Sequence, residues 1–303
     1  MAAKRLIAPP PTPMREDLSL DLSPIERQVE LLVESGVSGA FVCGSTGESL
    51  SLTVRERKAV AERWVALAPE GFDIIIHVGH NALPAAIELA AHAKEIGASA
   101  IAAMPPCYFK PRTVQDVAEW CSRLASAAPD LPFYYYHIPA LSGVNVRVSD
   151  FLRLAADRIP KLAGVKYTWE DLSDFALCVG LDGGRFDMLF GRDEMLLAGL
   201  ALGAAGAIGS TYNFAAPLFL DLIEAFEAGD LERAQREQRR AAQLVRVLHR
   251  HGGPEVFKAT MKLIGLDLGP PRPPLPSLSA EQLDAVRADL QSIGFFDYCS
   301  AVP

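Results

Sequence analysis

The feature that most constrains the fold is an alternation of short apolar runs and amphipathic helical stretches, which continues up to Gly229 of this 303-residue chain. The apolar runs have the length of strands and recur about thirty residues apart, each followed by a helical pattern. Eight such units predict a (β/α)8 TIM barrel of roughly 230 residues. A doubly wound parallel sheet is the alternative, because alternation alone does not separate the two folds. The predicted strands are Arg5–Pro9, Gly39–Cys43, Asp73–Val78, Ser99–Met104, Pro132–Ile138, Lys161–Tyr167, Asp187–Gly191 and Ala204–Gly209.

The chain changes character after Gly229, where helical patterns follow one another without strands. The proline-rich segment 269–276 is expected to be a stiff, extended connector between the last two of these helices. We therefore expect a catalytic barrel over residues 1–230 and a helical extension over residues 231–303 that packs on it. The predicted helices are Pro24–Ser35, Thr53–Ala68, Leu83–Ile96, Thr113–Ala127, Ser149–Asp157, Leu172–Val179, Asp193–Leu202, Ala216–Ala228, Leu231–Arg250, Pro254–Ile264 and Ala280–Ser292.

Composition and charge exclude several classes of function. Hydrophobic residues make up 50% of the chain and charged residues 22%, which is typical of a globular protein with a large core. A net charge of −8 argues against a nucleic-acid partner, which would require clustered basic residues. The arginines of 231–250 alternate with glutamates and indicate a solvated helix face. The chain starts without a signal peptide and has no apolar stretch suited to a membrane, so we expect no membrane partner.

The cysteines and histidines indicate a reduced, metal-free protein. The five cysteines are widely spaced and odd in number, which favours free thiols in the cytoplasm over disulfides or a zinc site. The histidines show no metal-ligand spacing at strand ends, and no glycine loop suited to phosphate binding is present. We therefore expect neither a metal nor a nucleotide cofactor.

The sixth predicted strand carries Lys166, which has no carboxylate within three residues. Alternation along the strand places Leu162, Gly164 and Lys166 on one face. Ala163 and Val165 then lie on the other face, and Gly164 would leave space beneath the lysine. Poor solvation lowers the pKa of an amine, and a neutral amine attacks carbonyl carbons to form a Schiff base. The alternative is a lysine at the end of a strand whose ammonium group reaches water or a distant carboxylate.

Polar residues also follow the second and fifth predicted strands. The segment 44–48, Gly-Ser-Thr-Gly-Glu, offers backbone amides and the hydroxyls of Ser45 and Thr46 to a carboxylate, although such residues are also ordinary in loops. Tyr136 ends the fifth strand, one strand before Lys166, so its phenol is a candidate general acid or base. His137 points the other way and is interpreted as structural.

The seventh and eighth predicted strands also end in polar residues. Asp193 follows the seventh strand and is either a substrate-binding acceptor or the N-cap of the next helix. The eighth strand leads into Gly209-Ser210-Thr211-Tyr212-Asn213. The glycines near this strand lack the spacing of a dinucleotide fingerprint and are interpreted as packing positions.

Four motifs together resemble the N-acetylneuraminate lyase and dihydrodipicolinate synthase family of class I aldolases. The motifs are 44–48, the segment 136–143, Gly164-Val165-Lys166, and 209–213, and the likeness extends from about Lys4 to Arg272. In this combination and order they are specific, although none would be alone. The resemblance implies a barrel with a C-terminal helical extension that assembles as a homotetramer, a dimer of dimers.

The resemblance also implies roles for individual residues. Lys166 would form the Schiff base with the keto carbon of the substrate, and Tyr136 would be the proton shuttle. Ser45 and Thr46 would hold the pyruvoyl carboxylate. Ser45 is counted among the catalytic residues as well, together with Lys166, Tyr136 and Tyr108. Tyr108 matches a position whose ring enters a neighbouring subunit's site in some members; the alternative is an aromatic residue that packs at an interface. The residues that match sugar-contacting positions of the lyases are Thr168, Gly191, Asp193, Glu194 and Ser210.

The substrate implied by the resemblance is a 2-keto sugar acid. The synthases carry an arginine shortly after the Tyr-x-x-Pro segment, where this chain has Ala140-Leu141, which argues against aspartate semialdehyde. Segments 134–141 and 189–194 resemble the lyases, so we expect reversible cleavage of N-acetylneuraminate to N-acetylmannosamine and pyruvate, with the lysine Schiff base in place of a cofactor. The alternatives are an aldolase or dehydratase of another 2-keto-3-deoxy sugar acid and a non-catalytic barrel that binds a keto acid. Arg192 departs from the family pattern and is expected to influence sugar preference.

Overall fold

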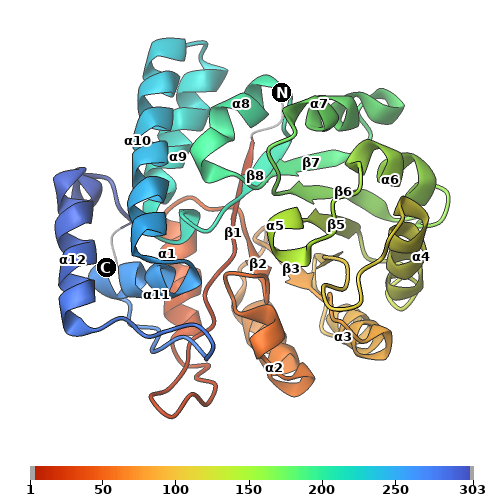
Figure 1. The fold of residues 1–303 in the computed structure, drawn as a ribbon, viewed down its shortest axis with the longest axis horizontal. Coiled ribbons are helices and arrows are strands. Elements are labelled where there is room, and N and C mark those ends of the chain that lie inside the picture. Colours follow the sequence, from red (N-terminus) through yellow and green to blue (C-terminus); the bar gives the residue numbers. More distant parts are fainter. Residues whose placement is uncertain (1–3, 301–303) are drawn as a thin grey trace.

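The computed structural model describes residues 4–300, in which eight parallel strands close into a barrel surrounded by helices (Figure 1). Each strand pairs with the next in sequence, and β8 returns to pair with β1. The TIM barrel prediction is therefore confirmed, and the doubly wound alternative is wrong because such a sheet would be open. The strands are β1 (Arg5–Ala8), β2 (Gly39–Val42), β3 (Asp73–His77), β4 (Ala100–Ala103), β5 (Phe133–His137), β6 (Leu162–Tyr167), β7 (Asp187–Phe190) and β8 (Gly206–Ile208).

Helices connect successive strands around the outside of the barrel. Two of them begin where the sequence predicts because Thr53 and Thr113 form capping boxes with the third residue of the helix. The short helix α5 was not predicted, since four residues are too few to show a helical period. The helices are α1 (Ile25–Glu34), α2 (Val54–Leu67), α3 (Leu83–Glu95), α4 (Val114–Ala125), α5 (Pro139–Ser142), α6 (Val148–Ala155), α7 (Leu172–Gly180), α8 (Leu196–Ala201) and α9 (Tyr212–Glu227), with short 3-10 turns η1 (Ser49–Ser51), η2 (Leu181–Gly183) and η3 (Asp193–Met195).

Two of the predicted helix starts are corrected by the structure. The helix predicted at Ala216 begins at Tyr212, because the chain turns into α9 directly after the eighth strand and Pro217 lies inside the helix. The helix predicted from Asp193 opens with the 3-10 turn η3 before α8 continues it.

The C-terminal extension lies on one side of the barrel (Figure 1). It contains α10 (Leu231–His251), α11 (Pro254–Leu263), α12 (Ala280–Ser292) and the turn η4 (Phe295–Asp297). Helix α10 packs against α9 and η3, and α12 packs against α10 and α11. The predicted bounds 1–230 and 231–303 run into residues 1–3 and 301–303, which lie outside the described part of the chain. None of the helices within residues 4–300 is long and apolar enough to cross a membrane.

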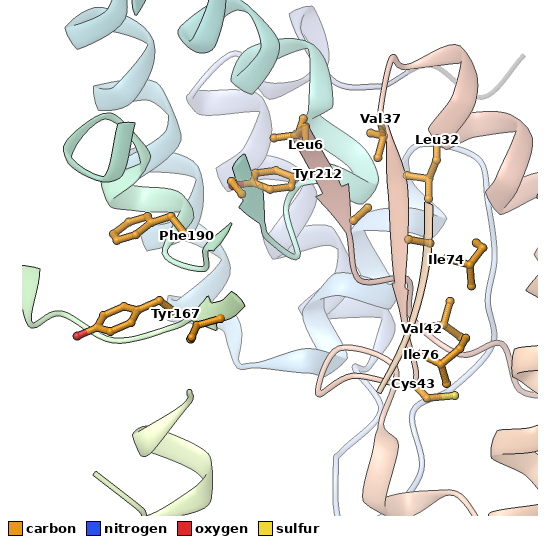
Figure 2. Close-up of a cluster of buried hydrophobic side chains, with 14 of the residues drawn as sticks. Leu6, Leu32, Val37, Val42, Cys43, Ile74, Ile76, Tyr167, Phe190 and Tyr212 are labelled. Atoms are coloured by element: carbon orange, nitrogen blue, oxygen red, sulfur yellow. The ribbon is translucent and has the colours of Figure 1, made fainter. Parts of the chain in front are cut away.

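The strands divide their buried side chains between two apolar clusters. An inner cluster fills the barrel and includes Phe41, Tyr134, Tyr136 and Leu189. A larger outer cluster lies between the strands and the helices, and Figure 2 shows part of it. Because side chains alternate along a strand, each strand supplies both clusters. This alternation directs Tyr136 into the barrel.

A bulge between β5 and β6 corrects the predicted faces of β6. Phe133 pairs with Leu162, whereas Tyr134 pairs with Gly164, so Ala163 is the extra residue. Leu162 therefore packs in the outer cluster and Ala163 against the inner one, the reverse of the prediction. The prediction for Gly164 was also wrong. A Cβ there would lie 1.9 Å from the Asp187 carbonyl oxygen, so this glycine lets β7 approach closely and leaves no space beneath the lysine.

Candidate active site

A cavity of about 250 Å³ opens at the carboxyl ends of the strands. Parallel strands of a closed barrel present their following loops at the same end, which is why residues from distant segments meet here. Of the predicted site residues, only Tyr108 is absent from the lining. The predicted residues that line the cavity are Ser45, Thr46, Tyr136, Lys166, Thr168, Gly191, Asp193, Glu194 and Ser210.

Lys166 lies in an apolar and aromatic environment inside the barrel. Its side chain is buried, and Nζ lies 4.2 Å from the ring centre of Phe41 and 4.3 Å from that of Tyr136. Burial removes water from the ammonium group and lowers the pKa of Lys166 to about 7, while the charge of Asp193 acts in the opposite direction. A large fraction of Lys166 is therefore the neutral amine at neutral pH.

The phenol ring of Tyr136 lies next to this amine. Burial raises the pKa of Tyr136 to about 12, and the hydroxyls of Ser45 and Thr168 partly oppose that shift. The Ser45 hydroxyl lies 3.4 Å from the phenolic oxygen. The Thr46 hydroxyl is hydrogen-bonded at 2.7 Å to that of Ser210, so the loops after β2 and β8 meet across the cavity.

Asp193 is buried at the cavity wall. Its Oδ2 accepts hydrogen bonds from the backbone N–H and the hydroxyl of Thr211, at 3.1 and 2.6 Å, while Oδ1 has no hydrogen-bond partner. The N-cap alternative is therefore wrong, because the carboxylate does not bond to the helix that follows it. Burial raises the pKa of Asp193 to about 6. A Cβ on Gly209 would lie 1.7 Å from Oδ1, so only glycine leaves room for this carboxylate.

The rim of the cavity beside Asp193 is charged. Arg192 contacts Glu194 at 2.8 Å and Glu170 at 2.5 Å, while its Nε is buried without a hydrogen-bond partner. Both Arg192 and Glu194 line the cavity. The sequence identified Arg192 as unusual, and the structure adds that it restrains the neighbouring carboxylate.

One wall of the cavity was not predicted from the sequence. Helices α10 and α11 contribute Val245, Leu248, His249 and Phe257 to the lining. Val245 and Leu248 lie on a buried face of α10, but no motif indicates which part of the barrel that face covers. The extension is thus part of the site.

Two further predicted residues lie away from the cavity. His137 packs between the rings of Tyr135 and Tyr167 on the outer side of β5, and burial lowers its pKa to about 4, in accord with the structural interpretation. Tyr108 is 77% exposed and stacks edge-to-face on Phe109, which is 86% exposed. Within residues 4–300, no group of three or more histidine, cysteine, aspartate or glutamate side chains is arranged to hold a metal ion.

Burying Lys166 is expected to reduce stability in a way that depends on pH. The folded pKa of about 7 lies below the unfolded value of 10.5, so the unfolded chain binds more protons and stability rises as the pH increases between these values. We expect Lys166→Met to increase the free energy of unfolding by roughly 3–5 kcal/mol near pH 7, and the gain to shrink towards pH 10. Denaturant unfolding at several pH values measures this. Lys161→Met, at an exposed position, is the control. If Lys166→Met raised the free energy of unfolding by the same amount at every pH, the prediction would be contradicted.

A barrel with a weakly basic lysine and a protonated phenol at the carboxyl ends of its strands has the arrangement of a Schiff-base aldolase. The Dihydrodipicolinate synthetase family matches residues 2–293. The chain therefore belongs to this family, as the sequence motifs predicted, and it is a carbon–carbon lyase. Class I aldolases of the family act through a lysine Schiff base without a metal cofactor.

Several relatives match over nearly their whole length. Human N-acetylneuraminate lyase is 43% identical over 298 residues, which cover 97% of this chain and 93% of the human protein. The structure of Proteus mirabilis N-acetylneuraminate lyase superposes with a TM-score of 0.93 at 41% identity, covering 96% of this chain and 99% of that one. A catalytic-lysine mutant of the Ruminococcus gnavus sialic acid aldolase has a TM-score of 0.91 at 30% identity, with 97% and 96% covered.

Proposed function

We propose that the protein cleaves N-acetylneuraminate reversibly to N-acetylmannosamine and pyruvate. The observation that carries the proposal is the buried amine of Lys166, with a pKa of about 7, beside the phenol of Tyr136. Relatives named for this substrate share 41–43% of their residues with the chain and support the choice of sugar. No separate cofactor is needed, because the protonated imine formed by Lys166 and the substrate accepts the electrons of the breaking bond.

In the first half of the reaction Lys166 attacks the keto carbon of the substrate. The neutral amine adds to the carbonyl and gives a carbinolamine. The hydroxyl group of this intermediate then leaves as water with a proton from Tyr136, which is protonated at the start because its pKa is about 12. The products of this step are a positively charged imine and a phenolate.

In the second half the phenolate of Tyr136 takes the proton of the C4 hydroxyl group. The bond between C3 and C4 breaks, its electrons flow into the imine, and the sugar leaves as an aldehyde. Tyr136 then returns this proton to C3 of the resulting enamine, which restores the positively charged imine. Water then hydrolyses the imine, which releases pyruvate and regenerates the amine of Lys166.

The substrate is held at two ends. The hydroxyls of Ser45 and Thr46 face the cavity and are suited to the carboxylate of the keto acid, next to the imine carbon. The sugar hydroxyls would contact Asp193 and Glu194, which accept hydrogen bonds, and the residues Thr168, Gly191 and Ser210. The position of the buried Asp193 carboxylate in the cavity lining supports this assignment.

The test of the proposed function is a substrate panel with pyruvate release as the measurement. We expect N-acetylneuraminate to yield pyruvate and N-acetylmannosamine, and the two products to condense in the reverse assay. If sialic acid remains intact while a 2-keto-3-deoxygluconate-type acid is cleaved, the aldolase chemistry stands and the proposed sugar is wrong. Binding without turnover of either acid would support a non-catalytic barrel instead.

We further propose a cytoplasmic homotetramer in which Tyr108 enters the site of a neighbouring subunit. The support is the exposure of two adjacent aromatic rings, Tyr108 and Phe109, and the absence of Tyr108 from the cavity of its own chain. The five cysteines are free thiols, which supports a reducing compartment. Residues 1–230 are proposed as the catalytic barrel and residues 231–303 as its extension.

A subunit-mixing experiment tests the role of Tyr108. Lys166→Ala and Tyr108→Ala are each expected to be nearly inactive, because one lacks the nucleophile and the other the neighbour's ring. Mixed oligomers formed by refolding them together contain sites with both an intact lysine and an intact tyrosine, so activity should return to a fraction of the wild-type value. Phe109→Ala is the control, because it removes the adjacent exposed ring and should leave the protein active by itself. Full activity of Tyr108→Ala by itself would contradict the prediction.

Arg192 is expected to tune the affinity for the sugar. Its guanidinium group restrains Glu194, so Arg192→Met should free this carboxylate and raise KM for N-acetylneuraminate about 3- to 10-fold, equivalent to about 1 kcal/mol. KM for pyruvate in the reverse reaction should not change. Arg185→Met is a matched control, since that arginine pairs with Asp182 on the surface. A higher KM for pyruvate in Arg192→Met would show that the effect is not confined to the sugar.

A further inference from the structure

The loop that follows β2 is held in an unusual conformation at Glu48. Glu48 adopts a positive φ of 59°, which L residues rarely occupy. Its N–H donates to the carbonyl of Ser45, and its carbonyl accepts from Ser51, so the turn that presents Ser45 and Thr46 depends on the backbone of Glu48. Whatever fixes Glu48 therefore also fixes the two hydroxyls that face the cavity.

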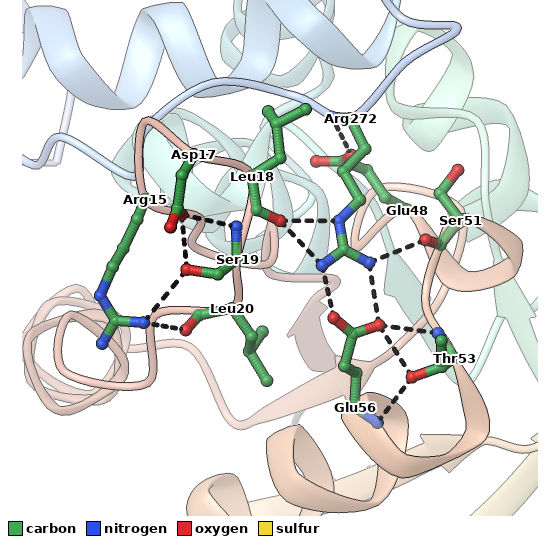
Figure 3. Close-up of polar contacts among 10 residues, drawn as sticks. All are labelled: Arg15, Asp17, Leu18, Ser19, Leu20, Glu48, Ser51, Thr53, Glu56 and Arg272. Carbon is green, nitrogen blue, oxygen red and sulfur yellow. Dashed lines mark hydrogen bonds and ion pairs between the residues drawn. The ribbon is translucent and has the colours of Figure 1, made fainter.

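The side chain of Glu48 is bonded to the C-terminal extension. Its Oε1 lies 2.6 Å from Nζ of Lys258, a residue of α11, and the two side chains are 2% and 3% exposed, respectively. Its Oε2 accepts a hydrogen bond of 2.7 Å from the backbone N–H of Arg272 (Figure 3). Lys258 also donates to the carbonyl of Pro270, so the helix and the connector are joined to each other as well.

The side chain of Arg272 extends this network to three more segments (Figure 3). Its guanidinium group donates to the carbonyls of Leu18 and Ser51, at distances between 2.9 and 3.1 Å. It also forms a bidentate pair with Glu56, the glutamate of the capping box that begins α2. The cations of Lys258 and Arg272 thus balance the carboxylates of Glu48 and Glu56. These four charges lie where the loop after β2 meets the C-terminal extension.

We propose that Lys258 and Arg272 are positioning residues that act through Glu48 to hold the Ser45–Thr46 turn in its carboxylate-binding geometry. This inference rests on the proposed function and deepens it, because it makes affinity for the keto acid depend on the C-terminal extension. Neither side chain lines the cavity, so both act at a distance from the substrate. Of the proposed sugar-contacting residues, Ser210 is bonded to Thr46 of this turn. Asp193 and Glu194 follow β7 and bond instead to other residues of the cavity lining, so the larger effect should fall on the keto-acid end.

The test is a comparison of KM values for the two substrates of the condensation reaction. Lys258→Met, Glu48→Gln and the double variant are each measured in the full-length protein with pyruvate and N-acetylmannosamine varied separately. We expect KM for pyruvate to rise on the order of 10- to 100-fold, as for misplacement of a binding group, with a much smaller rise in KM for N-acetylmannosamine. Lys262→Met is the matched control, because Lys262 lies on the same helix but pairs with Asp267 at the exposed surface.

The double variant keeps the proposal testable if a single variant fails to fold. It removes both buried charges together, so no unpaired ion remains in the interior. An unchanged KM for pyruvate in the folded double variant would overturn the inference. An equal rise in KM for both substrates, which a general loosening of the fold would cause, would overturn it as well.

Borohydride trapping of wild-type protein with pyruvate separates the two proposals. If wild type forms no adduct, the proposed function fails and this inference with it; an adduct of equal yield at low pyruvate in wild type and variants refutes the inference alone.

Discussion

Lys166→Ala is expected to abolish both turnover and covalent trapping. Borohydride reduction of the wild-type protein in the presence of pyruvate should add the mass of one reduced pyruvyl group, located on the peptide that contains Lys166. The alanine variant has no amine to form the imine, so the adduct should be absent and kcat should fall by roughly 10⁴-fold or more, as for removal of other nucleophiles. Intact-mass measurement and peptide mapping check the first result, and a pyruvate-release assay checks the second.

The control for this experiment lies just before the same strand. Lys161 is exposed, and Lys161→Ala should leave the adduct and the rate at wild-type values. An adduct that survives Lys166→Ala would place the nucleophile elsewhere and would remove the basis of the proposed mechanism. Trapping should also become slower below pH 7, because the amine of Lys166, with a pKa of about 7, is then protonated.

Tyr136→Phe should separate the carbon–carbon cleavage step from the stability of the fold. The ring of Tyr136 packs edge-to-face on Phe41 at 5.4 Å, and phenylalanine preserves this packing while removing the proton donor. We expect kcat for cleavage to fall by about 10²- to 10⁴-fold, the usual contribution of a general acid or base. Thermal unfolding should change little, since the contact of the hydroxyl with Ser45 is long, at 3.4 Å.

Tyr134→Phe provides the matched control on the same strand and the same face. The Tyr134 hydroxyl donates to Asp187 at 2.9 Å, away from the cavity. Its loss should lower stability by about 1 kcal/mol, as for a typical hydrogen bond, without changing kcat. If Tyr136→Phe and Tyr134→Phe have the same rate, the phenol at position 136 is not the proton shuttle.

The strands could be predicted closely because buried parallel strands leave a strong sequence signal. Each is a short apolar run bounded by polar or glycine residues, and β6 was predicted to within one residue of its start. The faces of β6 could not be predicted in full. The bulge at Ala163 depends on how β5 and β6 align, which is a property of two segments and is not written in either one alone.

The residues of the candidate site also fall into those that could be predicted from the sequence and those that could not. Ser45, Tyr136, Lys166 and Asp193 could be predicted because each follows or ends a strand, and barrel topology alone brings those positions together. The cavity wall formed by α10 and α11 could not be predicted. A hydrophobic helix face indicates that another segment covers it, but the sequence does not indicate which segment. The contact between Glu48 and Arg272, which are 224 residues apart, is of this second kind.

The attachment of Glu48 to Lys258 and Arg272 has a consequence for the biosynthesis of the protein. A ribosome releases the segments that carry the amine and the phenol well before the codon for residue 272 is translated. On the inference above, a chain that ends before α11 carries the amine and the phenol but lacks both contacts that hold Glu48, and it also lacks the α11 part of the cavity wall. The polypeptide from α11 onwards is therefore needed for binding although it holds none of the reacting groups.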